Sequence, residues 1–525
     1  MDNSPYKAAR VVRQAKSFAI AKVLSACVAV LFQFLLVRHL SVVDYVSFTV
    51  LTAANGILVF ATMFGMDRLV YRLVPPLRDA GRWREMAALM GGLLLLRQLT
   101  IALLLGGFVW LGALLLPAQI YAETCKFPWH YAWYAVAVGC TDSLAIFCNS
   151  VGLQGRQATL LTGMTSLRLL ACLLLQTLFG GLLAIDVGRV LIGTEFLLAA
   201  ALLLLLAREL AGVRRSHPPA GAWKFGFAWG ELVRDSISTQ LTYMLTLPFR
   251  GGVLKLVVAA VATPLVTASF GFFQTIADRA YQFMPIFMMK GMLEPALASD
   301  YALRRDPGRI QLSVSLLLRM NFLILALALA LLLGCGGPLI DWVTNGRYGA
   351  ELLVAGLLLV QLGAMTVGEG LWISLNPVGR IALHNRIWVW VALLCYLLIA
   401  TAAWLRNPEL IIVGSALPYA LVFAWLRWVA AEPMVQDDLG LRSMWRLALP
   451  VGAAALAARA VLLAGSGHAL VVLAVLAGAG VFLLGVRRTR LFRPAELDGI
   501  GSVSPKFARL LKYVSPAAGD HPMKD

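Results

Sequence analysis

Apolar runs separated by short polar segments occupy almost the whole of this chain. Most of the runs are long enough to cross the hydrocarbon core of a bilayer as an α-helix, which takes about 20 residues. We therefore predict fourteen transmembrane helices. Their expected bounds are 18–37, 46–66, 86–116, 131–152, 159–182, 188–207, 236–261, 265–297, 311–337, 351–374, 387–404, 410–430, 446–463 and 468–486.

The basic residues test this count, because Lys and Arg collect on the cytoplasmic side of membrane proteins. With the N-terminus inside, and with Arg189, Arg427 and Arg446 near span ends counted in the adjacent loops, 31 of the 45 basic residues fall in inside segments, five in outside loops and nine within spans. One helix too many or too few would disturb this alternation along the rest of the chain. We therefore expect both termini to be cytoplasmic.

Composition excludes most soluble classes of protein. Of the 525 residues, 60% are hydrophobic and 14% are charged, and the mean hydropathy is +0.80. Soluble domains are about 45–50% apolar and about 25% charged. The chain contains seven Cys and six His without a CxxC or HExxH pattern, so we expect no metal site and no cofactor. No segment could form a soluble nucleic-acid-binding domain, despite the net charge of +18.

A long inside segment divides the chain into six spans before it and eight after it. It contains Arg214-Arg215-Ser216-His217-Pro218-Pro219 followed by a mixture of aromatic and basic residues, which is typical of a segment at the membrane interface. If the last two spans are an appendage, the remainder is six plus six. The expected organisation is 1–207, an N-terminal lobe; 208–235, a cytoplasmic interfacial linker; 236–431, a C-terminal lobe; 432–486, spans 13 and 14; and 487–525, a cytoplasmic tail.

Charged residues within the spans are the main functional signal. A charge at the centre of a bilayer costs at least about 2.5–3.5 kcal/mol, so such residues usually face water or each other. The basic residues within spans are Lys22, Arg97, Arg168, Arg250, Lys255, Arg279, Lys290, Arg319 and Arg459. The acidic ones are Asp142, Glu195, Asp278, Glu294 and Glu369. This surplus of cations favours an anionic or phosphorylated substrate, since the Arg fork binds phosphate and carboxylate well.

Helical spacing places several of these charges on polar stripes. The stripes are Lys22, Ser25, Ala29 and Gln33; Thr165, Arg168, Cys172 and Gln176; and Gln274, Asp278, Tyr281 and Gln282. Small and polar residues also favour ordinary packing between membrane helices, and that alternative applies best to the uncharged members. For the stripes that carry Arg or Lys, a watery cavity is the favoured interpretation.

The seventh span contains a predicted break. Its sequence Leu247-Pro248-Phe249-Arg250-Gly251-Gly252-Val253-Leu254-Lys255 combines a proline, which removes a backbone hydrogen bond, with two glycines. Broken helices near the midplane often mark transporter sites. Arg250 and Lys255 flank the break.

Several motifs resemble those of the Wzx-type oligosaccharide-lipid flippases. These are Arg38-His39-Leu40-Ser41-Val42-Val43-Asp44-Tyr45, Phe64-Gly65-Met66-Asp67-Arg68-Leu69-Val70, Asn345-Gly346-Arg347-Tyr348 and Asn376-Pro377-Val378-Gly379-Arg380. Val46 departs from the pattern, because many relatives carry Gly after the Tyr. The S-D-A-F-type entry to the second span that suggests the lipid II flippase branch is absent.

The resemblance implies a fold and an activity. The fold would be all-α and polytopic, with two six-helix lobes in a MATE-like arrangement plus two C-terminal helices. The substrate would be an oligosaccharide on undecaprenyl diphosphate, moved by alternating access from the cytoplasmic to the periplasmic leaflet of the bacterial inner membrane for exopolysaccharide or O-antigen synthesis. Coupling to H⁺ or Na⁺ is implied, and a polysaccharide polymerase and export machinery are candidate partners.

Combining the charges with this resemblance gives the expected site. Headgroup contacts are assigned to Lys22, Arg97, Arg168, Arg250, Lys255, Arg279 and Lys290, and ion coupling to Asp278 and Glu369. The alternatives are a MATE-like drug or cation antiporter, which should have an acid-rich cavity, and a membrane glycosyltransferase or polymerase. Such an enzyme usually needs a sizeable loop with catalytic acids, and the largest outside loop, 117–130, has Glu123 as its only carboxylate. We therefore expect a transporter and no enzymatic activity.

Overall fold

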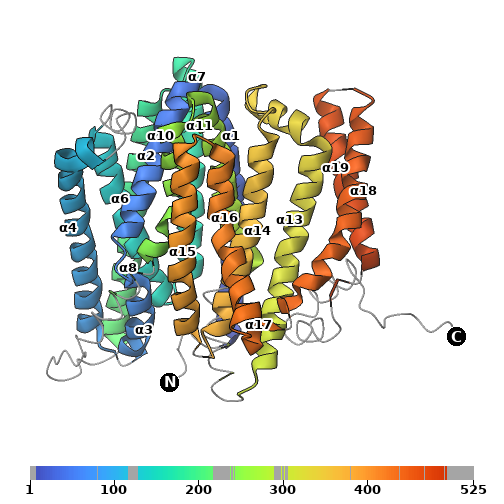
Figure 1. Cartoon of the computed structure of the whole chain (residues 1–525). Helices are drawn as coiled ribbons and strands as arrows, with labels where there is room; N and C mark the ends of the chain where they lie inside the picture. The colour runs from blue at the N-terminus through green and yellow to red at the C-terminus, as the bar shows by residue number, and fades with distance from the viewer. Residues whose placement is uncertain are drawn as a thin grey trace. The chain divides into compact units, whose positions relative to one another are not determined.

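The structure is a computed structural model of the full chain (Figure 1). It describes residues 8–79, 81–115, 128–216, 237, 240–241, 243–288, 297, 301, 305–378, 380–436, 438–465, 467–489 and 491–492. Throughout these residues the regular secondary structure is helical and contains no strand, as expected for segments that must satisfy their backbone hydrogen bonds within a bilayer. This confirms the all-α fold class.

The number of membrane-spanning helices is close to the expected fourteen. Among the described residues, twelve helices are long and apolar enough to cross a membrane, and the bent pair Tyr243–Phe249 and Gly251–Val261 raises the number to thirteen. The eighth expected span corresponds to α11 (Pro264–Phe283), whose polar residues Gln274, Asp278 and Arg279 lower its hydropathy. Arg and Asp on this helix therefore have to be accommodated by neighbouring polar groups.

Two compact units are present, Met1–Arg279 and Ala280–Asp525. This boundary falls inside α11, whereas the sequence suggested lobes that meet at the 208–235 linker; those lobes remain a prediction. The linker itself begins as helix, because α8 continues to Ser216, and its later residues lie outside the described part of the chain, as does most of the expected tail.

The first unit is built from helices in short succession. They are α1 (Ala8–His39), α2 (Val42–Ala61), α3 (Met66–Asp79), α4 (Trp83–Leu115), α6 (Pro128–Ser150), α7 (Gln154–Phe179), α8 (Ala184–Ser216), the 3-10 turn η1 (Leu247–Phe249), α10 (Gly251–Val261) and the greater part of α11. Helix α1 packs on α7, α6 on α8, and α2 on α10.

Helix α3 was not anticipated. Met66, Val70, Val74 and Leu77 lie at helical spacing and are buried against α4 and α6, together with Met86 and Phe147. Its sequence lies between two membrane spans and contains Arg72 and Arg78 on an otherwise amphipathic segment, which is typical of a helix at the membrane surface. The apolar spacing 66, 70, 74, 77 was the signal that could have revealed it.

The second unit contains the remaining helices. They are α13 (Pro307–Thr344), α14 (Leu352–Leu375), α15 (Ile381–Trp404), α16 (Pro408–Ala424), the π-helical turn η2 (Trp425–Val429), α17 (Pro433–Gln436), η3 (Asp438–Leu447), α18 (Ala448–Leu462) and α19 (His468–Thr489). The last two pack together as a helical hairpin, seen in orange and red in Figure 1.

Arg319 belongs to the packing of this second unit. It is 2% exposed on α13, and its Nη1 donates a hydrogen bond of 2.6 Å to the backbone carbonyl of Leu491, just beyond α19. A carbonyl near a helix C-terminus is a favourable acceptor for a cation. Arg319 therefore connects α13 to the end of the α18–α19 hairpin.

The turn after α13 explains one of the motifs. Asn345 ends the helix with a positive φ of 54°, and Gly346 follows with a φ of 77°, a conformation that Asn and Gly adopt more readily than other residues. Tyr348 is fully buried, and its backbone N–H donates to Thr344 Oγ1. Burial raises the pKa of Tyr348 to about 12, so its hydroxyl remains neutral at physiological pH.

Candidate functional site: a cationic cluster in the first unit

The predicted break in the seventh span is confirmed. The helix axes before and after Arg250 differ by 48°, and Arg250 itself has extended backbone between the 3-10 turn and α10. The glycines allow close approach on both sides: a Cβ at Gly252 would lie 3.2 Å from the Ala53 carbonyl of α2, and one at Gly251 would lie 2.6 Å from Asp278. The guanidinium of Arg250 lies over the ring of Phe60, 4.8 Å from its centroid.

Lys255 and Asp278 form an ion pair beside this break. Nζ of Lys255 lies 3.4 Å from Oδ2 of Asp278 and donates to Oγ1 of Thr275 at 2.8 Å. The other carboxylate oxygen of Asp278 accepts a hydrogen bond of 2.9 Å from Gln274. The Lys255 side chain is 7% exposed and that of Asp278 is 41% exposed. In this conformation Lys255 is therefore neutralised by Asp278.

Arg168 is held by two residues of α8. Its Nη2 lies 2.5 Å from Oε1 of Glu195, and its Nε donates to Oγ1 of Thr194 at 2.8 Å. Both side chains of the ion pair are about one-tenth exposed. Of the other predicted members of the α7 stripe, Thr165 and Cys172 are buried, in agreement with ordinary helix packing for uncharged positions, and Gln176 is half-buried.

Arg279 and Lys22 are the accessible cations near this pair. The charge of Arg279 acts on Lys22, Tyr134, Arg168 and Glu195, so the site combines groups from α1, α6, α7, α8 and α11. It also acts on the neighbouring pair of Asp278 and Lys255. Lys22 is half-buried and lies over the ring of Phe18, whereas Arg279 is exposed. None of the ion pairs found among the described residues includes Lys22 or Arg279.

We call these five residues, Lys22, Tyr134, Arg168, Glu195 and Arg279, the Arg168 cluster. It contains three cations and one carboxylate, so its formal charge is positive even with Glu195 ionised. Like charges are held together in a chain only where an anion or water can offset their repulsion. The cluster is therefore suited chemically to bind an anion, through the fork of Arg279 and the point charge of Lys22.

Arg97 occupies a different environment. Its side chain is 0% exposed and donates to Ser143 Oγ at 3.0 Å, to the Val59 carbonyl at 2.8 Å and to Asp142 Oδ2 at 2.8 Å. These contacts connect α4 to α2 and α6. The guanidinium of Arg97 is therefore hydrogen-bonded to acceptors of the protein itself, and Arg97 is not part of the Arg168 cluster.

The remaining predicted residues are separate from the cluster. Glu369 lies on α14 of the second unit, half-buried, and its charge acts on the buried His384 of α15. A Cβ at either neighbouring glycine would meet Tyr419 or Leu318 within 3.1 Å, so Glu369 is closely surrounded by helices rather than placed in an open space. Lys290 lies outside the described residues.

Glu195 and Tyr134 were not predicted as site residues. Glu195 was recognised as an acid within a span, but its partner could not be identified, and a Tyr in a membrane helix has no distinctive spacing. The signal that could have been used is the pair Thr194-Glu195, a hydroxyl and a carboxylate within the otherwise apolar stretch 190–207 of α8.

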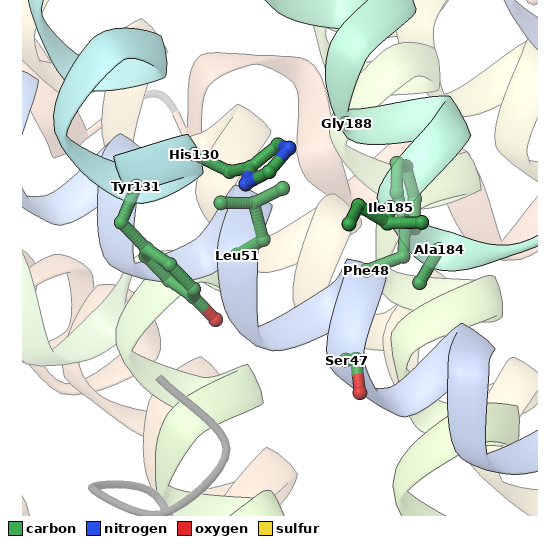
Figure 2. A pocket seen from close by; sticks show the side chains of 8 residues that line it. All are labelled: Ser47, Phe48, Leu51, His130, Tyr131, Ala184, Ile185 and Gly188. Atoms are coloured by element: carbon green, nitrogen blue, oxygen red, sulfur yellow. The ribbon is translucent and has the colours of Figure 1, made fainter. Parts of the chain in front are cut away.

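A small pocket elsewhere in the first unit has a different character. It is lined by Ser47, Phe48, Leu51, His130, Tyr131, Ala184, Ile185 and Gly188, from the first turns of α6 and α8 and from α2. Figure 2 shows the His130 ring lying above Leu51. A Cβ at Gly188 would be 3.5 Å from this ring, so the glycine leaves room for it. The lining is mostly apolar and includes none of the predicted headgroup residues.

Comparison with known proteins supports the fold. No family model matches the chain, and no curated protein matches it by sequence. Its structure is similar to that of the lipid II flippase MurJ in an inward closed conformation. The TM-score is 0.65 at 11% identity, and the similarity covers 89% of this chain and 97% of that one. This chain has a MurJ-like fold.

Two further structures are more distant. The Vibrio cholerae MATE transporter VcmN, in a mutant form, gives a TM-score of 0.43 at 13% identity over 80% of this chain and 98% of its own. The same transporter in the bent form gives 0.36 at 13% identity, over 81% and 99% of the two chains.

Proposed function

We propose that this protein is a flippase that carries a polyprenyl-diphosphate-linked oligosaccharide from the cytoplasmic to the periplasmic leaflet of the bacterial inner membrane. The observation that carries the proposal is the Arg168 cluster, in which the cations Lys22, Arg168 and Arg279 outnumber the carboxylate of Glu195 within a membrane-spanning unit. The other carboxylate that acts on Arg279, Asp278, is already paired with Lys255. A diphosphate supplies the negative charge that this cluster lacks. The fold similarity to a lipid flippase supports the proposal independently.

The proposed contacts divide into two groups. Lys22 and Arg279 are accessible and would meet the headgroup first, with Arg168 behind them. Arg250 and Lys255 flank the break in the seventh span and would contact the headgroup as the helices rearrange during alternating access. Arg97 and Lys290 remain proposed contacts from sequence alone, and the protein acceptors around Arg97 favour a packing role for it in this conformation.

Ion coupling is proposed for Asp278 and Glu369, with H⁺ or Na⁺ as the driving ion. Asp278 neutralises the buried Lys255, so a change in its charge would change the contact between α10 and α11. Glu369 lies among closely packed helices of the second unit, where taking up a cation would reduce the cost of its burial. The product would be used in exopolysaccharide or O-antigen synthesis, with a polysaccharide polymerase as partner.

A drug or cation antiporter fits the site less well. Such a transporter requires an acidic surplus where the cluster has a basic one, and Glu195 is already paired with Arg168. The geometry therefore favours an anionic lipid.

The experiment that tests this function compares substrates in vesicles. The purified protein is reconstituted with three fluorescent lipids: a polyprenyl-diphosphate saccharide, the same saccharide on a neutral polyprenyl ether, and phosphatidylcholine. Dithionite destroys the fluorophore in the outer leaflet, so the protected fraction reports flipping. We expect rapid equilibration of the diphosphate lipid alone. Equal rates for all three lipids would contradict the proposal by showing a nonspecific scramblase, and movement of none would contradict the flippase activity itself.

A further inference from the structure

Glu195 is the acid in closest contact with the proposed headgroup site. Its Oε1 accepts the 2.5 Å hydrogen bond from Arg168, while Thr194, its neighbour on α8, accepts from Nε of the same guanidinium. The residue is 8% exposed. While Glu195 remains charged and in place, Nε and Nη2 of Arg168 are therefore occupied and cannot both donate to an anion.

The second oxygen of this carboxylate is unusual. Oε2 of Glu195 is buried and has no hydrogen-bond partner among the described residues. An ionised carboxylate normally accepts at both oxygens, and a buried oxygen without a donor costs about 1–3 kcal/mol. A proton on Oε2 would remove the charge from this oxygen. The arrangement is therefore that of a carboxylate with one oxygen occupied by Arg168 and one available to a proton.

The charged and titratable groups around Glu195 come from several helices. Arg168 faces it from α7, Tyr134 from α6 and Arg279 from α11. Helices α2 and α4 also pack on α8. Their charged residues are engaged elsewhere: Asp44 of α2 with Ser41 and the start of α8, and Arg97 of α4 with Asp142. At the start of α4, Arg84 lies over the ring of Trp83 and Glu85 pairs with Arg82. The positive charges of Arg168 and Arg279 act on the Glu195 carboxylate, and a bound anion would offset them.

We propose that Glu195 takes up one proton when the anionic headgroup binds, releasing Arg168 to the headgroup. A proton from water adds to Oε2, the ion pair between Arg168 and Glu195 opens, and the Arg168 Nη2–H donates to a phosphate oxygen instead. The negative charge of the headgroup offsets the positive charges around Glu195. This inference rests on the proposed function, because it requires an anion in the Arg168 cluster.

Binding of the proton and the headgroup is then reciprocal. If the anion makes protonation of Glu195 easier, the proton must strengthen anion binding by the same factor. Flipping of the lipid would thus carry a proton in the same direction and reduce the net negative charge that crosses the membrane. This proton is distinct from the driving ion proposed above. Asp278 and Glu369 would not be needed for this proton.

The test uses an anion whose own charge does not change with pH. Methanedisulfonate resembles a diphosphate in having two linked tetrahedral anions, and its sulfonates remain ionised throughout the range studied. Its binding to the full chain in lipid nanodiscs is measured by calorimetry between pH 6 and pH 8, in two buffers of different ionisation heat. The difference between the buffers gives the number of protons taken up.

For the wild-type protein we expect uptake approaching one proton for each probe bound. The dissociation constant should fall with decreasing pH, by up to about tenfold per pH unit for one coupled proton. In Glu195→Gln, which keeps the shape of the side chain but cannot be charged, uptake should vanish and the affinity should become independent of pH. The matched control is Asp186→Asn on the same helix, which removes the carboxylate of the exposed Asp186–Arg189 pair and should behave as the wild type.

Several outcomes would overturn the inference. Binding by the wild type without proton uptake would do so whether or not Glu195→Gln folds, and so would affinity that depends on Na⁺ and not on pH. Proton-linked binding that persists in Glu195→Gln would assign the proton to another group. Absence of binding at every pH would contradict both the headgroup site and the linkage. Proton-linked binding in a protein that moves no lipid would contradict the proposed function and leave the linkage in place.

Discussion

Asp278 forms an ion pair with Lys255 of α10, and not with Arg279, its neighbour in sequence. The carboxylate lies against the first turn of α10, where a Cβ at Gly251 would be 2.6 Å away. This pairing has two consequences. It connects α11 to the helix that follows the break, and it leaves Arg279 exposed beside Lys22 and Arg168.

Removal of the Asp278 charge should destabilise the protein more than removal of its partner. In Asp278→Asn the ammonium of Lys255 remains buried without a counter-charge, whereas in Lys255→Met the partly exposed carboxylate can be solvated. We expect a loss of about 1–3 kcal/mol in the first variant and less in the second. Thermal unfolding in detergent measures both. The double variant should recover part of the loss; additive effects of the two substitutions would contradict the pairing.

Arg97 should act on stability rather than on substrate affinity. Arg97→Met removes three hydrogen bonds between α4, α2 and α6, while the partly exposed carboxylate of Asp142 can be solvated, so we expect a loss of about 1–3 kcal/mol. The protein that still folds should bind methanedisulfonate as the wild type does. A folded Arg97→Met protein with normal stability and greatly weakened anion binding would contradict this packing role and indicate that Arg97 contacts the headgroup.

Glycine at position 334 should be required for the contact between α13 and α18. A Cβ there would lie 2.7 Å from the Ala455 carbonyl and 2.8 Å from the Ala458 Cβ, so a larger side chain must separate the two helices. We expect Gly334→Val to lower the stability by about 1–3 kcal/mol.

The control for this substitution is Gly452→Val on α18, where nothing lies within 4 Å of the added Cβ. It should change the stability by less than about 1 kcal/mol, because the helix propensities of Val and Gly differ by only a few tenths of a kcal/mol. Equal effects of the two substitutions on the unfolding temperature would contradict the close packing of α13 on α18.

The features that could be predicted from the sequence are local ones. The length of each apolar run indicates by itself whether the run can cross a bilayer as a helix. The break at Pro248 with Gly251 and Gly252 follows from backbone chemistry within a few residues. Helix α3 could also have been found locally, because its buried residues repeat at helical spacing. The polar stripe on α1 was recognised correctly as a stripe, although Gln33 hydrogen-bonds to Tyr45 and serves packing.

The environment of each charge could not be predicted, because it depends on how the helices are rotated against one another. Arg97 and Arg279 are the same residue type and both lie within expected spans, yet one is fully buried among hydrogen-bond acceptors and the other is exposed. The pairing of Arg168 with Glu195 joins residues 27 positions apart. Neither composition nor spacing within a single helix contains that information.

The most direct test of the central claim is the flipping rate of the diphosphate lipid in vesicles containing Lys22→Ala, Arg279→Ala or Arg189→Ala. Arg189 is an exposed arginine on α8 outside the Arg168 cluster, so its removal controls for the loss of a positive charge in the same unit. Each cluster contact to a charged group is worth about 1.5–3 kcal/mol, so we expect rates about 10- to 100-fold lower for the first two variants and an unchanged rate for Arg189→Ala. Wild-type rates in folded Lys22→Ala and Arg279→Ala proteins would contradict the assignment of the Arg168 cluster as the headgroup site.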